Sequence, residues 1–290
     1  MENRRKRLLL LYDSPHMTRP LLKRILKIDP SLLFPFSIST DELSRQLAIP
    51  YQRAKSILGH IKDHNIMKKL DKFESDFSIF TWFDEDFPMN LRSIPDPPLV
   101  LYIQGDSTIL QSPLSISVVG TRNPSSYAFP SMRNVLIPLI RSGFTIVSGM
   151  AIGIDQYAHR LATEQQGKTI AVLGSGFYHI YPRNDLGLYK QMIREHLVIS
   201  EYPPDRPAKK YHFPERNRII SGLTPSTFVI EARLKSGTLI TVDQALEQGR
   251  DVYALPGPAG SMTSEGCHKM INEGAKLVHT YHDIVEDWIK

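Results

Sequence analysis

The hydrophobic pattern of the chain changes near residue 115. Beyond that point, short runs that are apolar on both faces and rich in β-branched residues alternate with longer segments of helical spacing. Such runs are typical of buried parallel strands, and their alternation with helices predicts an α/β fold with a doubly wound parallel sheet. The predicted strands span 116–119, 145–147, 169–173, 197–200, 227–230 and 251–255, and the predicted helices span 125–142, 152–166, 185–195, 214–222 and 238–249.

The first 114 residues follow other patterns. Apolar residues recur at helical spacing over 1–70, which predicts a small N-terminal helical domain. Within it, 41–49 and 52–66 flank Pro50-Tyr51 and resemble a helix-turn-helix, although a helical bundle without DNA contacts fits the same pattern. Residues 71–114 are predicted to form a connector whose strands, at 77–83 and 99–103, join the sheet of a large domain at 115–290.

The charge of the chain is unevenly distributed. Residues 1–75 hold 15 Lys and Arg against 8 Asp and Glu, whereas residues 76–290 hold 20 against 22. A nucleic-acid site in the large domain must therefore be a local basic patch rather than a diffuse field.

Cysteine usage and hydropathy indicate the compartment. Cys267 is the single cysteine, so no intrachain disulfide and no cysteine-based zinc site can form, and a filler role is expected for it. The apolar run at 8–11 is too short for a signal peptide, and no stretch reaches the roughly 18 apolar residues that span a bilayer. We therefore expect a cytoplasmic protein without a membrane partner.

Glycine-containing turns follow most of the predicted strands. The carboxyl ends of parallel strands share one edge of the sheet, so these turns should converge there. The stretch 145–155 adds a strand, a tight turn and a helix start, a geometry that suits a phosphate. A phosphate-binding rim is therefore predicted from the turns Gly120-Thr121-Arg122, Ser148-Gly149, Gly174-Ser175-Gly176, Ser236-Gly237-Thr238 and Pro256-Gly257.

Several common sites do not fit the sequence. The first strand ends in Gly120-Thr121-Arg122, which lacks the second glycine of a dinucleotide fingerprint, and neither a P-loop nor a Gly-x-Ser-x-Gly motif occurs. Asp155 and His159 share one helix face, so a metal pair is conceivable. We favour a structural role for both, with Asp155 bracing its loop, and assign no catalytic residue, no metal site and no cofactor.

Cationic residues cluster near the glycine turns. Several separated cations suit a polymer of phosphates better than a mononucleotide, although some could instead pair with Asp185, Glu215 or Glu231. Phe177, Tyr178 and Tyr181 are candidates for base stacking, with core packing as the alternative. The clustered cations are Arg122, Arg183, Arg216, Arg218 and Lys235.

Several short motifs between residues 90 and 280 match a known family. The chain resembles the DNA-processing protein A family (DprA, also called Smf), and the resemblance covers roughly residues 90–280. The matching stretches occur in the family's order and include Asp96-Pro97-Pro98, Val118-Val119-Gly120-Thr121-Arg122, residues 148–159, Tyr181-Pro182-Arg183-Asn184, Phe213-Pro214-x-Arg216-Asn217-Arg218, Lys235-Ser236-Gly237-Thr238 and Gln248-Gly249-Arg250.

The resemblance implies a function. It implies a Rossmann-like, mostly parallel core that forms a homodimer and binds single-stranded DNA, with weaker binding of duplex DNA and no catalysed reaction. It also implies protection of incoming DNA in natural transformation and loading of the RecA recombinase. The binding residues implied by the resemblance and the turns are Gly120, Arg122, Ser148, Gly149, Gly174, Gly176, Arg183, Arg216, Asn217, Arg218, Lys235, Ser236 and Gly237.

Other expectations accompany the resemblance. The N-terminal segment matches the family's sterile-alpha-motif-like domain only loosely, and a C-terminal winged helix is expected to be absent because the chain stops at Lys290. A nucleotide phosphoribohydrolase using Glu231 or Asp155 is an alternative, although its Pro-Gly-Gly-x-Gly-Thr run does not occur. A DNA-binding regulator acting through the N-terminal helices is another.

Overall fold

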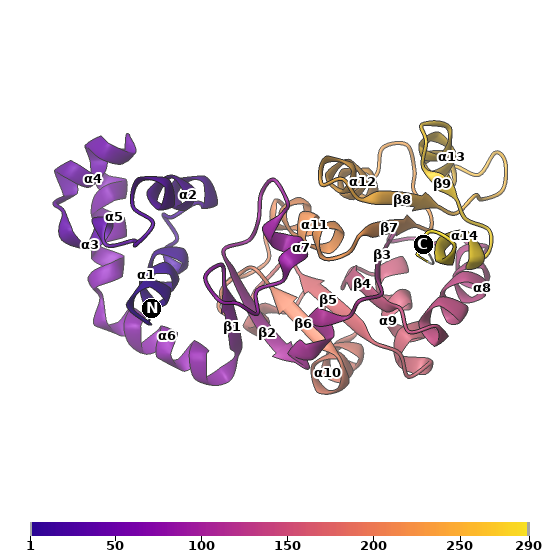
Figure 1. The fold of residues 1–290 in the computed structure, drawn as a ribbon, viewed down its shortest axis with the longest axis horizontal. Helices are drawn as coiled ribbons and strands as arrows, with labels where there is room; N and C mark the ends of the chain where they lie inside the picture. Colours follow the sequence, from indigo (N-terminus) through magenta and orange to yellow (C-terminus); the bar gives the residue numbers. More distant parts are fainter. Residues whose placement is uncertain (1, 289–290) are drawn as a thin grey trace. The chain divides into compact units, whose positions relative to one another are not determined.

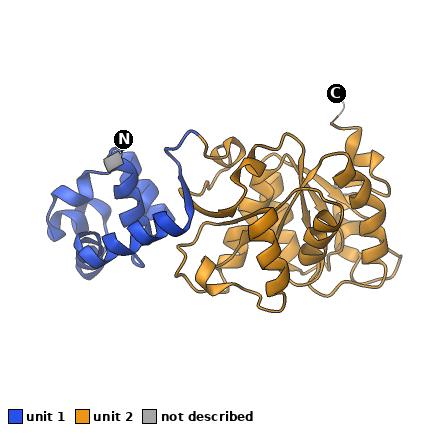
Figure 2. Cartoon of the chain, turned by 90° about the horizontal axis from the view of Figure 1, so that it is seen from below, with its two compact units in different colours: residues 1–85 blue, residues 86–290 orange. Residues whose placement is uncertain are grey.

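The chain forms two compact units. The computed structural model describes residues 2–288 and separates Met1–Glu85 from Asp86–Lys290 (Figure 2). The first unit thus extends past the helical segment expected at 1–70. The finer division at 70 and 114 stays a prediction.

The first unit is built from amphipathic helices. Their buried side chains include Leu22, Ile25, Leu43 and Ile57. Ser39 and Glu42 form a capping box, in which each side chain meets the backbone of the other residue and fixes the start of α4. The elements are α1 (Glu2–Asp13), α2 (Arg19–Ile28), α3 (Phe34–Ser37), α4 (Thr40–Leu47), α5 (Tyr51–Lys62), α6 (His64–Asp76) and β1 (Ser78–Thr81).

The second unit contains the predicted sheet. Its strands lie in the order β2-β6-β5-β4-β3-β7-β8-β9 (Figure 1). All neighbours from β6 to β9 are parallel, and β2 runs antiparallel to β6. The mixed, mostly parallel α/β fold is therefore confirmed. The strands are β2 (Val100–Gly105), β3 (Ser115–Val119), β4 (Thr145–Gly149), β5 (Thr169–Leu173), β6 (Leu197–Ser200), β7 (Ser226–Val229), β8 (Asp251–Ala254) and β9 (Lys276–Leu277).

Helices of the second unit alternate with these strands along the chain, with α7 before β2 and α14 after β9. The five predicted helices are present, and the sequence patterns missed the short elements and the last two helices. The helical elements are α7 (Met89–Arg92), η1 (Ser107–Gln111), α8 (Ala128–Arg141), α9 (Ile154–Glu164), η2 (Phe177–His179), α10 (Leu186–Glu195), α11 (His212–Leu223), α12 (Gly237–Glu247), α13 (Glu265–Asn272) and α14 (His282–Val285).

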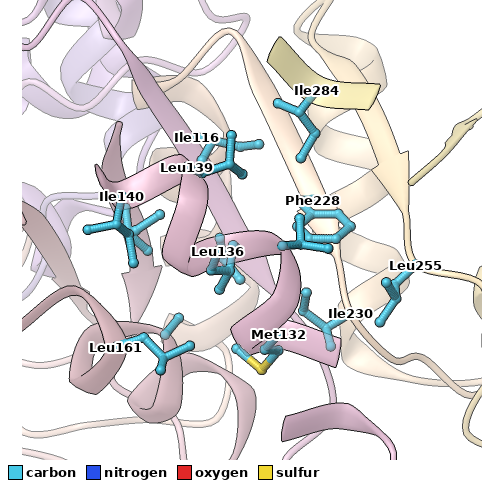
Figure 3. Close-up of a cluster of buried hydrophobic side chains, with 14 of the residues drawn as sticks. Ile116, Met132, Leu136, Leu139, Ile140, Leu161, Phe228, Ile230, Leu255 and Ile284 are labelled. Carbon is cyan, nitrogen blue, oxygen red and sulfur yellow. The ribbon is translucent and has the colours of Figure 1, made fainter. Parts of the chain in front are cut away.

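Strand β3 shows why both faces of the sheet are covered. Ile116 and Val118 belong to the cluster of buried side chains that α8 and α9 contribute to (Figure 3). Ser117 points to the opposite face, where its hydroxyl donates to the Ile220 carbonyl of α11 at 2.7 Å. Because side chains alternate along a strand, a run buried on both faces needs a helix layer on each.

Candidate nucleic-acid interface

A small pocket, partly open to solvent, lies at the carboxyl ends of β3, β4 and β5. The loops after these strands form its walls, and the start of α11 covers one side. This is the edge at which parallel α/β sheets bind ligands. The lining residues are Arg122, Met150, Ala151, Ile152, Val172, Leu173, Gly174, Tyr181, Pro182, Phe213 and Arg216.

Gly149 lets a buried arginine reach the pocket. A Cβ at this position would collide with Nη1 of Arg216 and lie 2.6 Å from Oδ2 of Asp155. The same Nη1 donates to the Val172 carbonyl at 2.7 Å, and Arg216 is only 4% exposed. A glycine is therefore required at the end of β4 because the guanidinium passes directly over the backbone.

Asp155 accompanies this arginine. Burial raises the pKa of Asp155 to about 6, while Arg216 and a hydrogen bond from the Ala151 amide act in the opposite direction. Burial also lowers the pKa of Arg216, and Asp155 opposes that shift. The carboxylate thus holds the loop after β4 and faces the buried cation, as the bracing interpretation of Asp155 requires.

His159 braces the same loop from behind. Its Nε2 lies 2.6 Å from the Gly149 carbonyl, and its Nδ1 lies 2.7 Å from the Thr169 hydroxyl. A carbonyl only accepts, so Nε2 carries the proton of the neutral ring. Burial lowers the pKa of His159 from 6.5 to about 4, partly offset by the bond to Gly149. A structural role is confirmed for this histidine.

The His159 shift predicts a pH-dependent effect of His159→Gln. Between pH 6.5 and 4 the unfolded chain binds a proton that the folded chain excludes, so this histidine costs stability as pH falls. We expect the difference in free energy of unfolding between wild type and variant to narrow by about 3 kcal/mol from pH 7 to pH 4. Urea unfolding of both proteins at several pH values measures this difference in free energy. A difference that stays constant with pH would contradict the lowered pKa of His159.

An exposed cation lies at the rim of the pocket. The side chain of Arg122 follows β3, and its Cζ lies 5.7 Å from the centroid of the Phe213 ring. Phe213 in turn lies 5.4 Å from the ring of Tyr181, between ring centroids. Gly174 makes room for Phe213, since a Cβ there would lie 2.9 Å from the ring. Arg122, Phe213 and Tyr181 thus form a contiguous cationic and aromatic wall.

Arg218 differs from its motif neighbour Arg216. Its Nη2 donates to both carboxylate oxygens of Glu201, at 2.6 and 2.7 Å, and its Nε lies 3.1 Å from Oδ2 of Asp96. Arg218 is 5% exposed and Glu201 is 1% exposed. The sequence predicts Arg218 to be among the DNA-binding residues. The structure corrects this, because a guanidinium held in a buried ion pair is not presented to DNA.

The loop after β7 is not part of the pocket lining. Lys235 and Gly237 are exposed and Ser236 is half-buried, but this loop follows a strand on the far side of β3 from β4 and β5. Lys235, Ser236 and Gly237 were expected to complete the pocket, but they are not among the residues that line it.

The other predicted residues have varied surroundings. The Ser148 hydroxyl is buried and donates to the Val118 carbonyl at 2.6 Å. A Cβ at Gly120 would meet Ile154, and one at Gly176 would collide with the carbonyls of 203 and 204. Arg183 is exposed and Asn217 is half-buried, and neither lines the pocket. The glycines thus shape the loops. Of the exposed cations, Arg122 lines the pocket and Arg183 directly follows the lining residues Tyr181 and Pro182, whereas Lys235 follows β7.

The carboxylates considered as arginine partners have other contacts. Asp185 pairs with Arg160, and Glu215 accepts from the Tyr202 hydroxyl at 2.9 Å. Glu231 is buried and accepts from the side chain and backbone of Ser125 and from Thr263. Glu231 therefore ties the loop after β7 to the loop after β3, which explains its burial without a reacting substrate.

Two of the three stacking candidates are accessible. Tyr178 is 48% exposed and Tyr181 is 49% exposed, whereas Phe177 is 6% exposed and packs in the core. For Phe177, the core-packing alternative therefore holds. Sequence reasoning also missed the apolar lining residues Met150, Ile152 and Pro182, whose only signal was their position beside a predicted turn.

Cys267 is buried and unpaired with another cysteine. Burial raises the pKa of the Cys267 thiol to about 12, consistent with a filler role. Among the described residues, no group of three or more His, Cys, Asp or Glu side chains could hold a metal ion. Within that same part of the chain, no helix has the length and apolar content to cross a membrane.

Comparison with known proteins identifies the family. A model described as DNA recombination-mediator protein A matches residues 78–289. The chain belongs to this family. DNA processing protein DprA of Bacillus subtilis is 44% identical over 203 residues, which cover 70% of this chain and 68% of that protein. DNA processing protein DprA of Streptococcus pneumoniae is 41% identical over 228 residues, which cover 79% of each chain.

Solved structures of DprA proteins share the fold. The X-ray structure of DNA processing protein A from Streptococcus pneumoniae superposes with a TM-score of 0.86 at 34% identity, covering 97% of this chain and 96% of that one. DNA processing protein A from Helicobacter pylori, studied for its single-stranded DNA binding mode, superposes with a TM-score of 0.66 at 27% identity. That match covers 74% of this chain and 97% of the relative.

Proposed function

We propose that this member of the DprA family binds single-stranded DNA at the pocket over β3, β4 and β5. The observation that carries the proposal is the wall formed by Arg122, Phe213 and Tyr181 beside the buried Arg216. The single-stranded DNA binding mode described for the Helicobacter pylori relative supports it. Duplex DNA is expected to bind this pocket more weakly.

The exposed arginines determine how the strand is held. Arg122 and Arg183 contact successive backbone phosphates, since a guanidinium forms paired hydrogen bonds with phosphate oxygens. Phosphate contacts carry no base information, so binding is expected to be unspecific and sensitive to salt. Arg216 lines the pocket but is buried, so it contributes positive potential rather than an exposed contact.

Aromatic side chains account for the preference for single strands. Unpaired bases stack on accessible rings, and each such contact contributes about 1–3 kcal/mol. Tyr181 is 49% exposed beside Phe213, and Tyr178 is 48% exposed on the preceding turn. A duplex keeps its bases stacked on one another and gains nothing from these rings.

The wider role is also part of the proposal. We infer that the protein acts in the cytoplasm as a homodimer, protects incoming DNA in natural transformation, loads RecA onto it, and catalyses no reaction. The dimer is supported by exposed apolar side chains on α12 and in the loop before it, namely Leu234, Ile240 and Leu246.

RecA filament nucleation tests this role. On single-stranded DNA coated with a single-strand-binding protein, the wild-type chain is expected to shorten the lag before RecA filaments form. The Arg122→Ala/Arg183→Ala variant should lose this effect, because it no longer holds the strand. An unchanged lag with wild-type protein that binds DNA normally would contradict RecA loading while leaving DNA binding in place.

A further inference from the structure

The helix pair α4–α5 of the first unit has the local pattern of a DNA-reading helix-turn-helix. Three residues, 48–50, join the two helices, and Ala48 adopts the left-handed conformation (φ 45°, ψ 51°) that a tight turn requires. The side chains that hold such a pair together are apolar and buried here. They are Leu43, Leu47, Ile49, Ala54 and Ile57.

The outer face of α5 carries no acidic side chain between Tyr51 and Lys62, and the exposed Asp63 follows directly as the C-cap of the helix. Gln52, Lys55, Ser56, Gly59 and Lys62 are spaced at helical intervals of three, four, seven and ten residues from Gln52, so they share one face. Ser56 is half-buried and the other four are exposed. Arg53 is left out of this set because its Nε donates to the His16 carbonyl at 3.0 Å, which holds the guanidinium within the first unit.

Gly59 lies in the middle of that face without a structural cause. A Cβ at this position would meet nothing within 4 Å, and Gly59 does not need a positive φ. Glycine in a helix interior costs roughly 1 kcal/mol relative to alanine. No described residue of the first unit lies close enough to require a glycine here, whereas the bare backbone at this point permits close approach of a large partner.

The chemistry of this face fits duplex DNA. An α-helix fits the major groove, where glutamine pairs with adenine and lysine with guanine, and lysine also contacts phosphates. The first unit holds 15 Lys and Arg against 11 Asp and Glu over residues 1–85. Among the described residues of α5, Tyr51 is the single exposed large apolar side chain, at 46% exposure. This is too little for an apolar protein partner.

We propose that α4–α5 is a duplex DNA-binding element, with α5 in the major groove. This site is separate from the single-strand pocket and independent of the function proposed for it. In such elements the first helix crosses the DNA backbone. At the start of α4, Glu42 is held by Ser39 in the capping box, whereas Asp41 is exposed and would repel a phosphate.

Charge variants of the full chain test the proposal. The background is Arg122→Ala/Arg183→Ala, which removes the pocket contribution, and the probe is a mixed-sequence 30-base-pair duplex, about three helical turns, followed by fluorescence anisotropy. Lys55→Glu/Lys62→Glu is expected to weaken duplex binding at least tenfold. The control pair Lys68→Glu/Lys72→Glu makes the same change in net charge at exposed positions of α6. It should change the dissociation constant for the duplex less than twofold.

Asp41→Asn tests the opposite effect, a gain in duplex affinity. It should tighten duplex binding about threefold by removing repulsion from phosphate, and circular dichroism verifies that each variant stays folded. Equal losses for the α5 and α6 pairs, or no gain with Asp41→Asn, would overturn the proposal. Single-strand binding by the same α5 and α6 variants with wild-type Arg122 and Arg183 should stay unchanged, so failure here and failure of the pocket are distinguishable.

Discussion

Glu201→Ala is expected to lower the free energy of unfolding by about 3–5 kcal/mol. The side chains of Arg218 and Glu201 are 6% and 1% exposed, and both carboxylate oxygens accept from the same guanidinium nitrogen. Alanine would leave a positive charge buried without its main counter-ion. The loss is large because the charge, once desolvated, cannot regain water without opening the second unit.

Asp96→Asn is the matched control for this effect. Asp96 contacts the same guanidinium, with 3.1 Å between Arg218 Nε and Asp96 Oδ2, but it is 42% exposed. A solvated partner of this kind contributes about 1 kcal/mol or less. Urea unfolding of both variants measures the contrast, and similar losses for the two would contradict the buried pair as the main support of Arg218.

Arg122→Ala/Arg183→Ala is expected to weaken single-strand binding at least tenfold, which corresponds to about 1.4 kcal/mol. Both side chains are exposed, so the fold should persist. The matched control is Arg141→Ala/Arg194→Ala, two exposed arginines at the ends of α8 and α10. These helices end just before β4 and β6 begin, which is the opposite edge of the sheet from the pocket.

An anisotropy titration with a short oligonucleotide checks this prediction. The control pair removes the same formal charge and should change the dissociation constant less than twofold. Equal weakening in both pairs would mean that net charge, rather than a defined site, controls binding.

The fold was predictable from sequence because its signals are local. A run such as 169–173 is short, partly β-branched and apolar on both faces, which favours a buried strand over a helix. The short strand β9, with two residues, and the helix α14, with four, are too brief for a period to be recognised.

The site was harder to predict because it depends on strand order and pairing. Arg216 and Arg218 are two residues apart in one motif, so their side chains leave α11 in different directions. The partner of Arg218 is Glu201, which follows β6 and gives no signal of that pairing in the sequence. Lys235 follows β7, and only the sheet order shows that β7 lies across β3 from the pocket.

The salt dependence of single-strand binding tests the central claim most directly, because it counts the phosphates that the protein neutralises. For single strands, each such contact contributes about 0.7 to the slope of log K against log salt. If Arg122 and Arg183 each hold one phosphate, the slope for Arg122→Ala/Arg183→Ala should be shallower than wild type by about 1.4. The slope for Arg141→Ala/Arg194→Ala should equal that of wild type. Identical slopes for wild type and Arg122→Ala/Arg183→Ala would contradict the proposed phosphate contacts.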